Sequence, residues 1–107
     1  MLKLTPNPTF KAQIALTVPG QPDPAQIEIE FKHQTRADLQ RWLARDVALE
    51  DALNEVIVSW DGVTDGNGRP LSYSADTLAM LLSNYPASGG ELLNSYLREL
   101  TESRRKN

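Results

Sequence analysis

The sequence contains no cysteine, and this absence excludes disulfide bonds, thiolate metal sites and thiol-based catalysis. Its single histidine, His33, has no neighbouring nucleophile in the sequence with which it would form an acid–base pair. No apolar run approaches the roughly 18 residues that a membrane-spanning helix needs, and the N-terminus lacks the apolar stretch of a signal peptide. We therefore expect a cytoplasmic protein with no membrane partner and no cofactor.

Positive charge is also scarce, since 11 Lys and Arg residues stand against 14 Asp and Glu residues. Proteins that bind nucleic acid irrespective of its sequence rely on clustered cations that displace counterions. The only basic cluster here is the terminal run Arg104-Arg105-Lys106. The composition thus argues against a nucleic-acid partner. The length of 107 residues fits a single domain, 1–107, with one core.

Two stretches near the N-terminus alternate between apolar and polar residues, which is the pattern of half-buried strands. The apolar positions are Phe10, Ala12, Ile14, Leu16 and Val18, followed by Ile27, Ile29 and Phe31. Prolines interrupt the segment between the two stretches, so we predict an antiparallel hairpin over about residues 10–32. An edge of this hairpin can accept a strand from another chain, or the helices and the proline-rich loop can cover it.

Beyond the hairpin, apolar residues recur at helical spacing. We predict helices over about residues 36–45, 49–59, 75–84 and 91–103. Thr35 and Ser74 are suitable N-caps, and Pro86 should end the third helix. Gly89 and Gly90 are expected to form a hinge before the last helix. A single kinked helix is the alternative for the first two. The fold class is therefore α+β, mainly α: an N-terminal antiparallel β-hairpin followed by a bundle of about four short helices.

No pattern in the sequence indicates catalysis or metal binding. The acidic, glycine-rich residues 61–72 suggest an EF-hand loop, but Val63 and Ser72 occupy positions where calcium requires oxygen ligands from carboxylates. A tight turn is the better interpretation. Glu28 and Glu30 are expected on the solvent face of a strand. We therefore predict neither catalytic nor metal-binding residues, and an enzyme such as a small hydrolase would need both a nucleophile and its base.

The last helix carries a row of apolar residues that we predict to be a protein-binding surface. The row consists of Leu92, Leu93, Tyr96, Leu97 and Leu100. The alternative is that this row completes the core. Trp42 and Trp60 are also candidates for either binding or core packing. Aromatic residues are favoured at binding hot spots, but the position of both tryptophans on an apolar stripe favours core packing.

The most distinctive part of the sequence is a series of short elements between residues 60 and 86. The series is Trp60-Asp61-Gly62-Val63, Asp65, Gly68, Leu71, Tyr73-Ser74, the apolar residues 78–82 and Tyr85-Pro86, before a closing amphipathic helix with Tyr96. With these elements in this order, residues 31–100 resemble the tail assembly chaperones of long-tailed bacteriophages and related prophages.

The resemblance implies a non-enzymatic, cytoplasmic protein that binds the tape measure protein, keeps it soluble during tail assembly and is absent from the mature virion. It also implies three further partners: a frameshift-extended form of the chain, the tail tube protein and other copies of the chain. Arg105-Lys106-Asn107 can be encoded with the slippery heptamer A-AAA-AAC, which would allow such a frameshift. The alternative is a non-enzymatic adaptor or regulatory module that recognises a folded protein.

Overall fold

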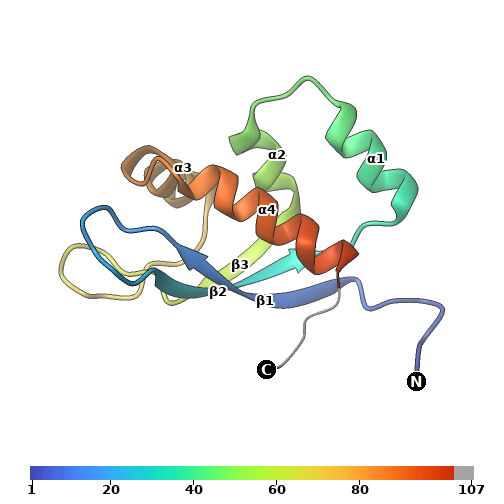
Figure 1. Cartoon of the computed structure of the whole chain (residues 1–107), viewed down its shortest axis with the longest axis horizontal. Coiled ribbons are helices and arrows are strands. Elements are labelled where there is room, and N and C mark those ends of the chain that lie inside the picture. The colour runs from blue at the N-terminus through green and yellow to red at the C-terminus, as the bar shows by residue number, and fades with distance from the viewer. Residues whose placement is uncertain (103–107) are drawn as a thin grey trace.

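The computed structural model describes residues 1–102, in which three strands and four helices share one hydrophobic core. The strands are β1 (Thr9–Leu16), β2 (Ala25–Lys32) and β3 (Ile57–Asp61). The helices are α1 (Arg36–Ala44), α2 (Leu49–Val56), α3 (Ala75–Asn84) and α4 (Ser88–Thr101). The strands form an antiparallel sheet in the order β1-β2-β3, and the helices lie together on one face of it (Figure 1). The predicted α+β class is confirmed.

The N-terminal hairpin follows from the alternating pattern of its two strands. Phe10 pairs with Phe31 and Ile14 pairs with Ile27, so the apolar side chains of both strands share one face. The main-chain amide of His33 donates a 2.9 Å hydrogen bond to the carbonyl of Pro8, which extends the ladder by one step. The helices bury this face, while the opposite face carries polar side chains.

An aromatic cluster joins the sheet to two of the helices. The ring of Tyr96 in α4 lies 4.8 Å from the ring of Phe31 in β2, and 5.5 Å from the ring of Trp42 in α1. Such aromatic pairs contribute about 0.5–1.5 kcal/mol beyond the burial of their area. The ring of Phe10 in β1 stacks against Tyr96 at 6.2 Å, so β1, β2, α1 and α4 meet in one place.

The helix predicted over residues 49–59 is wrong at its C-terminal end. In the structure α2 stops at Val56, and the chain continues directly into β3. Ile57 and Trp60 fit a helical stripe, but they also fit a short strand, and β2 offers a partner for it. Trp60 pairs with Ile29, and a bulge lies between Glu30 and Phe31. Pairing with β2 thus makes residues 57–61 a strand, although their apolar spacing also fits a helix.

The last helix begins at Ser88, earlier than the predicted residue 91, and the predicted hinge is wrong because Gly89 and Gly90 lie inside the helix. A Cβ atom at Gly89 would lie 3.1 Å from a methyl carbon of Leu49. Glycine therefore allows α4 to approach α2 closely, and this packing offsets the low helix propensity of glycine. The predicted end of this helix, residue 103, lies outside the described residues.

The helix caps agree with the sequence. Thr35 accepts a 3.2 Å hydrogen bond from the amide of Asp38 at the start of α1. Ser74 accepts from the amide of Thr77 at 3.1 Å, and the hydroxyl of Thr77 accepts from the amide of Ser74 at 2.8 Å. This reciprocal pair is a capping box. The third helix ends at Asn84, as Pro86 predicts.

Candidate functional site

The signature that begins at Trp60 builds a folded-back loop between β3 and α3. The indole of Trp60 donates a 2.7 Å hydrogen bond to the carbonyl of Leu71, and its ring packs edge-on against Tyr73 at 5.3 Å. The amide of Leu71 donates to the carbonyl of Val63 at 2.8 Å. The loop therefore closes onto the strand from which it starts, and these residues have a structural role.

Two glycines of the signature adopt backbone angles that other residues rarely reach. The φ angle is +93° at Gly62 and +79° at Gly68. Asp65 completes the turn around Gly68, because its carboxylate accepts hydrogen bonds from the amides of Asn67 and Arg69 at 2.8 and 3.0 Å. One carboxylate oxygen of Asp65, Oδ1, thus accepts from two main-chain amides, as the interpretation as a tight turn requires.

The end of the signature fixes the passage from α3 to α4. Tyr85 is the C-cap of α3, and its amide donates to the carbonyl of Leu81 at 3.0 Å. The hydroxyl of the buried Ser88 donates a 2.7 Å hydrogen bond to the carbonyl of Tyr85. Pro86 lies between them and prevents α3 from continuing.

The five apolar residues predicted as a binding surface on α4 divide into two groups. Leu92 and Tyr96 are completely buried and belong to the core, so they cannot contact a partner in this structure. Leu93, Leu97 and Leu100 are partly buried. Leu93 lies beside α1 and α2, whereas Leu100 lies beside Thr9 and Phe10 at the start of β1. For these three residues, a role in binding stays a prediction.

Leu93 opens onto an apolar hollow of about 150 Å³ between α1, α2 and α4. Its lining comes from both helices of the α1–α2 pair and from the segment that joins them. We call it the apolar hollow, and its lining residues are Trp42, Leu43, Arg45, Val47, Leu49, Ala52 and Leu93. Leu43, Val47 and Leu49 are among the most exposed large apolar side chains of the described residues. Exposed apolar side chains gathered around a hollow mark a surface for protein binding.

The sequence did not reveal this hollow. Leu43, Val47 and Leu49 continue the apolar stripe of the first two predicted helices, which suggests that all of them are buried. Their exposure depends on how far α4 reaches over α2, and no local pattern encodes that distance. Val47 gave the one available signal, because an apolar residue in a short polar connection has no helix or strand to bury it.

One ion pair lies at the rim of the apolar hollow. Arg45 donates hydrogen bonds to both carboxylate oxygens of Glu55, one of them at 2.7 Å. These bonds lower the pKa of Glu55 and raise the pKa of Arg45. Both side chains are exposed to solvent, so the pair orients the rim more than it stabilises the fold.

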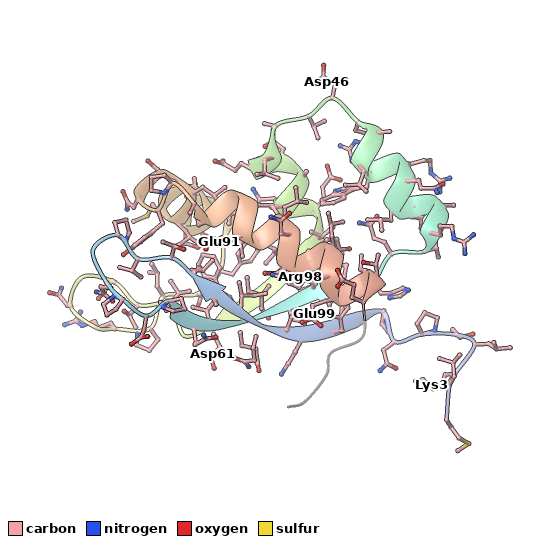
Figure 2. All side chains as sticks on the ribbon, viewed as in Figure 1. Lys3, Asp46, Asp61, Glu91, Arg98 and Glu99 are labelled. Atoms are coloured by element: carbon pink, nitrogen blue, oxygen red, sulfur yellow. The ribbon has the colours of Figure 1, made fainter. Side chains whose placement is uncertain are left out.

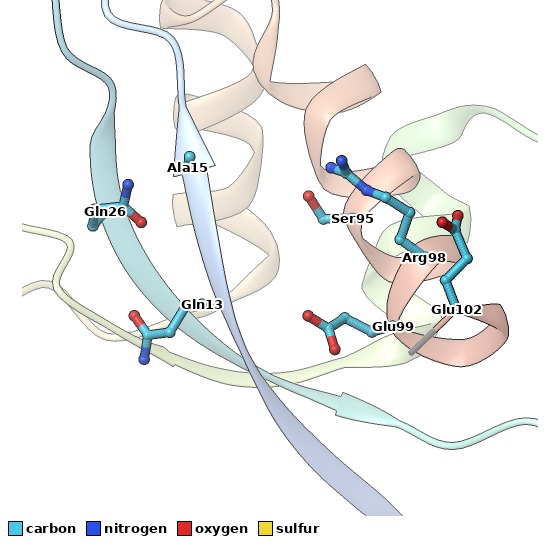
Figure 3. Close-up of a pocket in the computed structure, with 7 residues that line it drawn as sticks. All are labelled: Gln13, Ala15, Gln26, Ser95, Arg98, Glu99 and Glu102. Carbon is cyan, nitrogen blue, oxygen red and sulfur yellow. The ribbon is translucent and has the colours of Figure 1, made fainter. Parts of the chain in front are cut away.

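A larger groove, of about 460 Å³, lies between the outer edge of β1 and α4. Its lining residues are Gln13, Ala15, Gln26, Ser95, Arg98, Glu99 and Glu102, and Figure 3 shows the Glu99 side chain directed toward β1. An apolar partner would leave these polar groups without water, which is costly. Near one end of β1, Thr17 donates hydrogen bonds to the Glu91 carboxylate of α4 at 2.6 and 2.9 Å. The helix therefore covers part of the hairpin edge.

The described residues hold no group of three His, Cys, Asp or Glu side chains that could bind a metal ion. His33 lies exposed in the connection between β2 and α1. Within residues 1–102, no helix has the length and apolar character needed to cross a bilayer. What residues 1–102 do present is an exposed apolar surface on a sheet-and-helix frame. Such a surface is typical of small protein-binding modules.

A comparison with protein families identifies the module more closely. The model of the family described as phage tail assembly chaperone matches residues 1–107, and the chain belongs to this family. The family is non-enzymatic. Comparisons with curated proteins and with solved structures give no significant match.

Proposed function

We propose that this chain binds the tape measure protein of a phage tail in the host cytoplasm and keeps it soluble until the tail tube forms around it. The observation that carries the proposal is the apolar hollow, which lies exposed on a member of the tail assembly chaperone family. The chaperone leaves the client as the tube forms, and it is not part of the mature virion.

The hollow suits a client with apolar stripes along its helices. A volume of about 150 Å³ is close to that of cavities that hold one benzene-sized group, so it accommodates one large apolar side chain. Burial of such a side chain contributes about 1.5–3 kcal/mol. Leu93 at the hollow and Leu97, about one turn further along α4, extend the contact. Each copy therefore holds the client weakly and reversibly, and several copies cover a long client.

Co-expression with the tape measure protein tests the proposal, with solubility and co-purification of the client as the readout. The hollow variant is Leu43→Ser with Val47→Ser, whose wild-type side chains are 50% and 40% exposed. The matched control is Met80→Ser with Val58→Ser, which are 54% and 40% exposed and do not line the hollow. All four side chains are exposed, so both variants should fold.

We expect the wild type and the control to keep the client soluble, and we expect the hollow variant to lose most of the soluble client. Circular dichroism should show the same folded content in all three proteins. If the hollow variant kept as much of the client soluble as the wild type does, the proposed binding surface would be wrong. An insoluble client with every form, together with a defined complex with one globular protein, would favour an adaptor instead.

We also propose that a frameshift-extended form of the chain and the tail tube protein are partners in assembly. The support is membership of the chaperone family and the codons available for Arg105-Lys106-Asn107, which lie outside the described residues. The nucleotide sequence tests the first partner: codons without a slippery heptamer here, and none upstream, would remove it. Pull-down of the tail tube protein by the purified chain tests the second.

A further inference from the structure

The outer edge of β1 presents main-chain groups that no other strand of the sheet uses. β1 comes first in the order β1-β2-β3, so it pairs with β2 on one side. The hydrogen bond from the His33 amide to the Pro8 carbonyl shows which residues face this ladder, because hydrogen-bonded pairs alternate along two antiparallel strands. Phe10 and every second residue after it therefore direct their main chain toward β2. Lys11 and Ala15 direct theirs outward, where a further strand can pair.

Helix α4 closes one end of this outer edge. The amide of Thr17 donates a 2.9 Å hydrogen bond to the Glu91 carboxylate, so this amide also points away from β2. Within residues 1–102, no such bond from outside the ladder involves the main-chain amides of Lys11 and Ala15. The side chains of Lys11 and Ala15 are exposed as well. The part of the edge before Thr17 is therefore open to a partner.

The groove of about 460 Å³ between β1 and α4, which we call the edge groove, lies directly beside this open part. Gln13 and Ala15 belong to its lining. A residue in a strand occupies about 160 Å³, from a rise of about 3.3 Å, a strand spacing of about 4.8 Å and a sheet spacing of about 10 Å. The edge groove therefore has room for about three residues of an added strand.

The wall that α4 contributes to the edge groove is polar, and negative charge prevails in it. The wall consists of Ser95, Arg98, Glu99 and Glu102, so two carboxylates stand against one guanidinium. Figure 2 shows Glu91, Arg98 and Glu99 in turn along α4, beside β1. A strand with basic side chains complements this wall, and an acidic strand is repelled by it. An apolar strand would remove water from the polar groups without replacing its hydrogen bonds.

We infer that the edge groove binds an extended segment of another protein, which pairs with β1 as a fourth strand and directs lysine or arginine side chains toward Glu99 and Glu102. In this mode of recognition the main-chain hydrogen bonds supply the affinity, and the side chains that alternate along the added strand supply the specificity.

The edge groove is separate from the apolar hollow. At about 100° per residue, its wall residues lie about 140–240° around α4 from Leu93, which lines the hollow. The two surfaces therefore lie on opposite flanks of the same helix, and the chain can hold two partners at once. The inference does not rest on the proposed function, because it involves neither the hollow nor the tape measure protein.

Hydrogen exchange of the full chain, followed by NMR, tests the inference with a short blocked peptide in which threonine and lysine alternate. We expect the amides of Lys11 and Ala15 to exchange at least about tenfold more slowly at saturating peptide, because each then donates a hydrogen bond. Unchanged exchange at millimolar peptide would overturn the inference. Slow exchange of both amides without peptide would also overturn it, because the chain itself or a second copy would then cover the edge.

Modified peptides test the charge and the main-chain pairing separately. A peptide with glutamate in place of lysine should leave the exchange of both amides unchanged. A strand directs every second amide toward a given neighbour, so N-methylation of one alternate set should abolish binding and N-methylation of the other should preserve it. Protection by the glutamate peptide, or the same effect from both methylated sets, would show that the inference is wrong.

Variants of the chain locate the charge that attracts the peptide. Glu99→Gln with Glu102→Gln removes both carboxylates of the wall, and it should weaken binding of the lysine peptide about 3- to 10-fold. The matched control, Asp46→Asn with Glu50→Gln, removes two exposed carboxylates that do not line the edge groove, and it should bind almost as the wild type does. An equal loss in both variants would overturn the inference, because net charge alone would then explain the attraction.

Discussion

The hydroxyl of Tyr96 in α4 donates a 2.8 Å hydrogen bond to the carbonyl of Lys32 at the end of β2. The same hydroxyl accepts a 3.0 Å hydrogen bond from the side-chain amide of Gln34. The ring of Tyr96 is completely buried, so its polar atom is satisfied inside the core. One side chain therefore links the last helix to the exit of the hairpin, 64 residues earlier in the chain.

Replacement Tyr96→Phe should lower the free energy of unfolding by about 1 kcal/mol, because two hydrogen bonds are lost while the ring remains packed. Urea unfolding followed by tryptophan fluorescence measures the change. Tyr85→Phe is the control, since no hydrogen bond of the Tyr85 hydroxyl occurs among the described residues. A loss of equal size in both variants would contradict the role of the Tyr96 hydroxyl.

Stability should fall in alkali. Burial raises the pKa of Tyr96, and the hydrogen bond from Gln34 opposes this only in part. Burial raises the pKa of Tyr73 as well. The folded protein therefore holds these protons more tightly than the unfolded chain, in which the tyrosine pKa is about 10. The resulting stabilisation is complete below the unfolded pKa and disappears as the pH rises through the folded pKa.

Urea unfolding at a series of pH values between about 9 and 11 checks this dependence. The free energy of unfolding of the wild type should decrease across the series. The decrease should be shallower in Tyr96→Phe, because the contribution of the Tyr96 hydroxyl is then absent. Parallel curves for the two proteins would show that Tyr96 does not titrate with unfolding.

The capping box at the start of α3 gives a third prediction. Ser74→Ala removes the acceptor for the amide of Thr77, and it should cost about 0.5–2 kcal/mol of stability. The comparison is Ser72→Ala, whose side chain is exposed in the preceding loop and caps no helix. Thermal unfolding by circular dichroism measures both. If Ser72→Ala were as destabilising as Ser74→Ala, the cap would not be the cause.

Gly62 of the signature provides a fourth prediction. Its φ angle of +93° is costly for a residue with a side chain, so Gly62→Ala should destabilise the protein by about 1–2 kcal/mol. Gly66→Ala is the matched control, because Gly66 has no positive φ and nothing lies within 4 Å of an added Cβ atom. We expect the control to change stability little. Scanning calorimetry distinguishes the two, and equal melting temperatures would contradict the backbone argument.

The elements that the sequence predicts well are those with a complete local signal. Ser74, Thr77 and Pro86 specify the start and end of α3, because a capping box and a proline act on their immediate neighbours. The hairpin is equally clear, since strict alternation from Phe10 to Leu16 fits only a strand with one buried face. In both cases the decisive interactions lie within a few residues of the chain.

The misjudged elements depend on partners that lie far away in the sequence. Ile57 to Trp60 form a strand because β2 is available beside them, and Gly89 enters a helix because α4 packs closely against Leu49. The apolar surface of α4 was assigned to binding as a whole, whereas Leu92 and Tyr96 belong to the core. Helical spacing shows which residues share a face, but not which face the sheet covers.

The direct passage from α2 into β3 has a mechanical consequence. No linker separates Val56 from Ile57, so α2 cannot tilt without pulling β3 out of its ladder with β2. α1 is instead joined on both sides by short non-helical connections, residues 33–35 and 45–48. Of the walls around the hollow, the one formed by α2 is therefore tied to the sheet by the chain itself. The one formed by α1 is held by side chains instead, among them the indole of Trp42, which donates a 3.3 Å hydrogen bond to the carbonyl of Ala52 in α2.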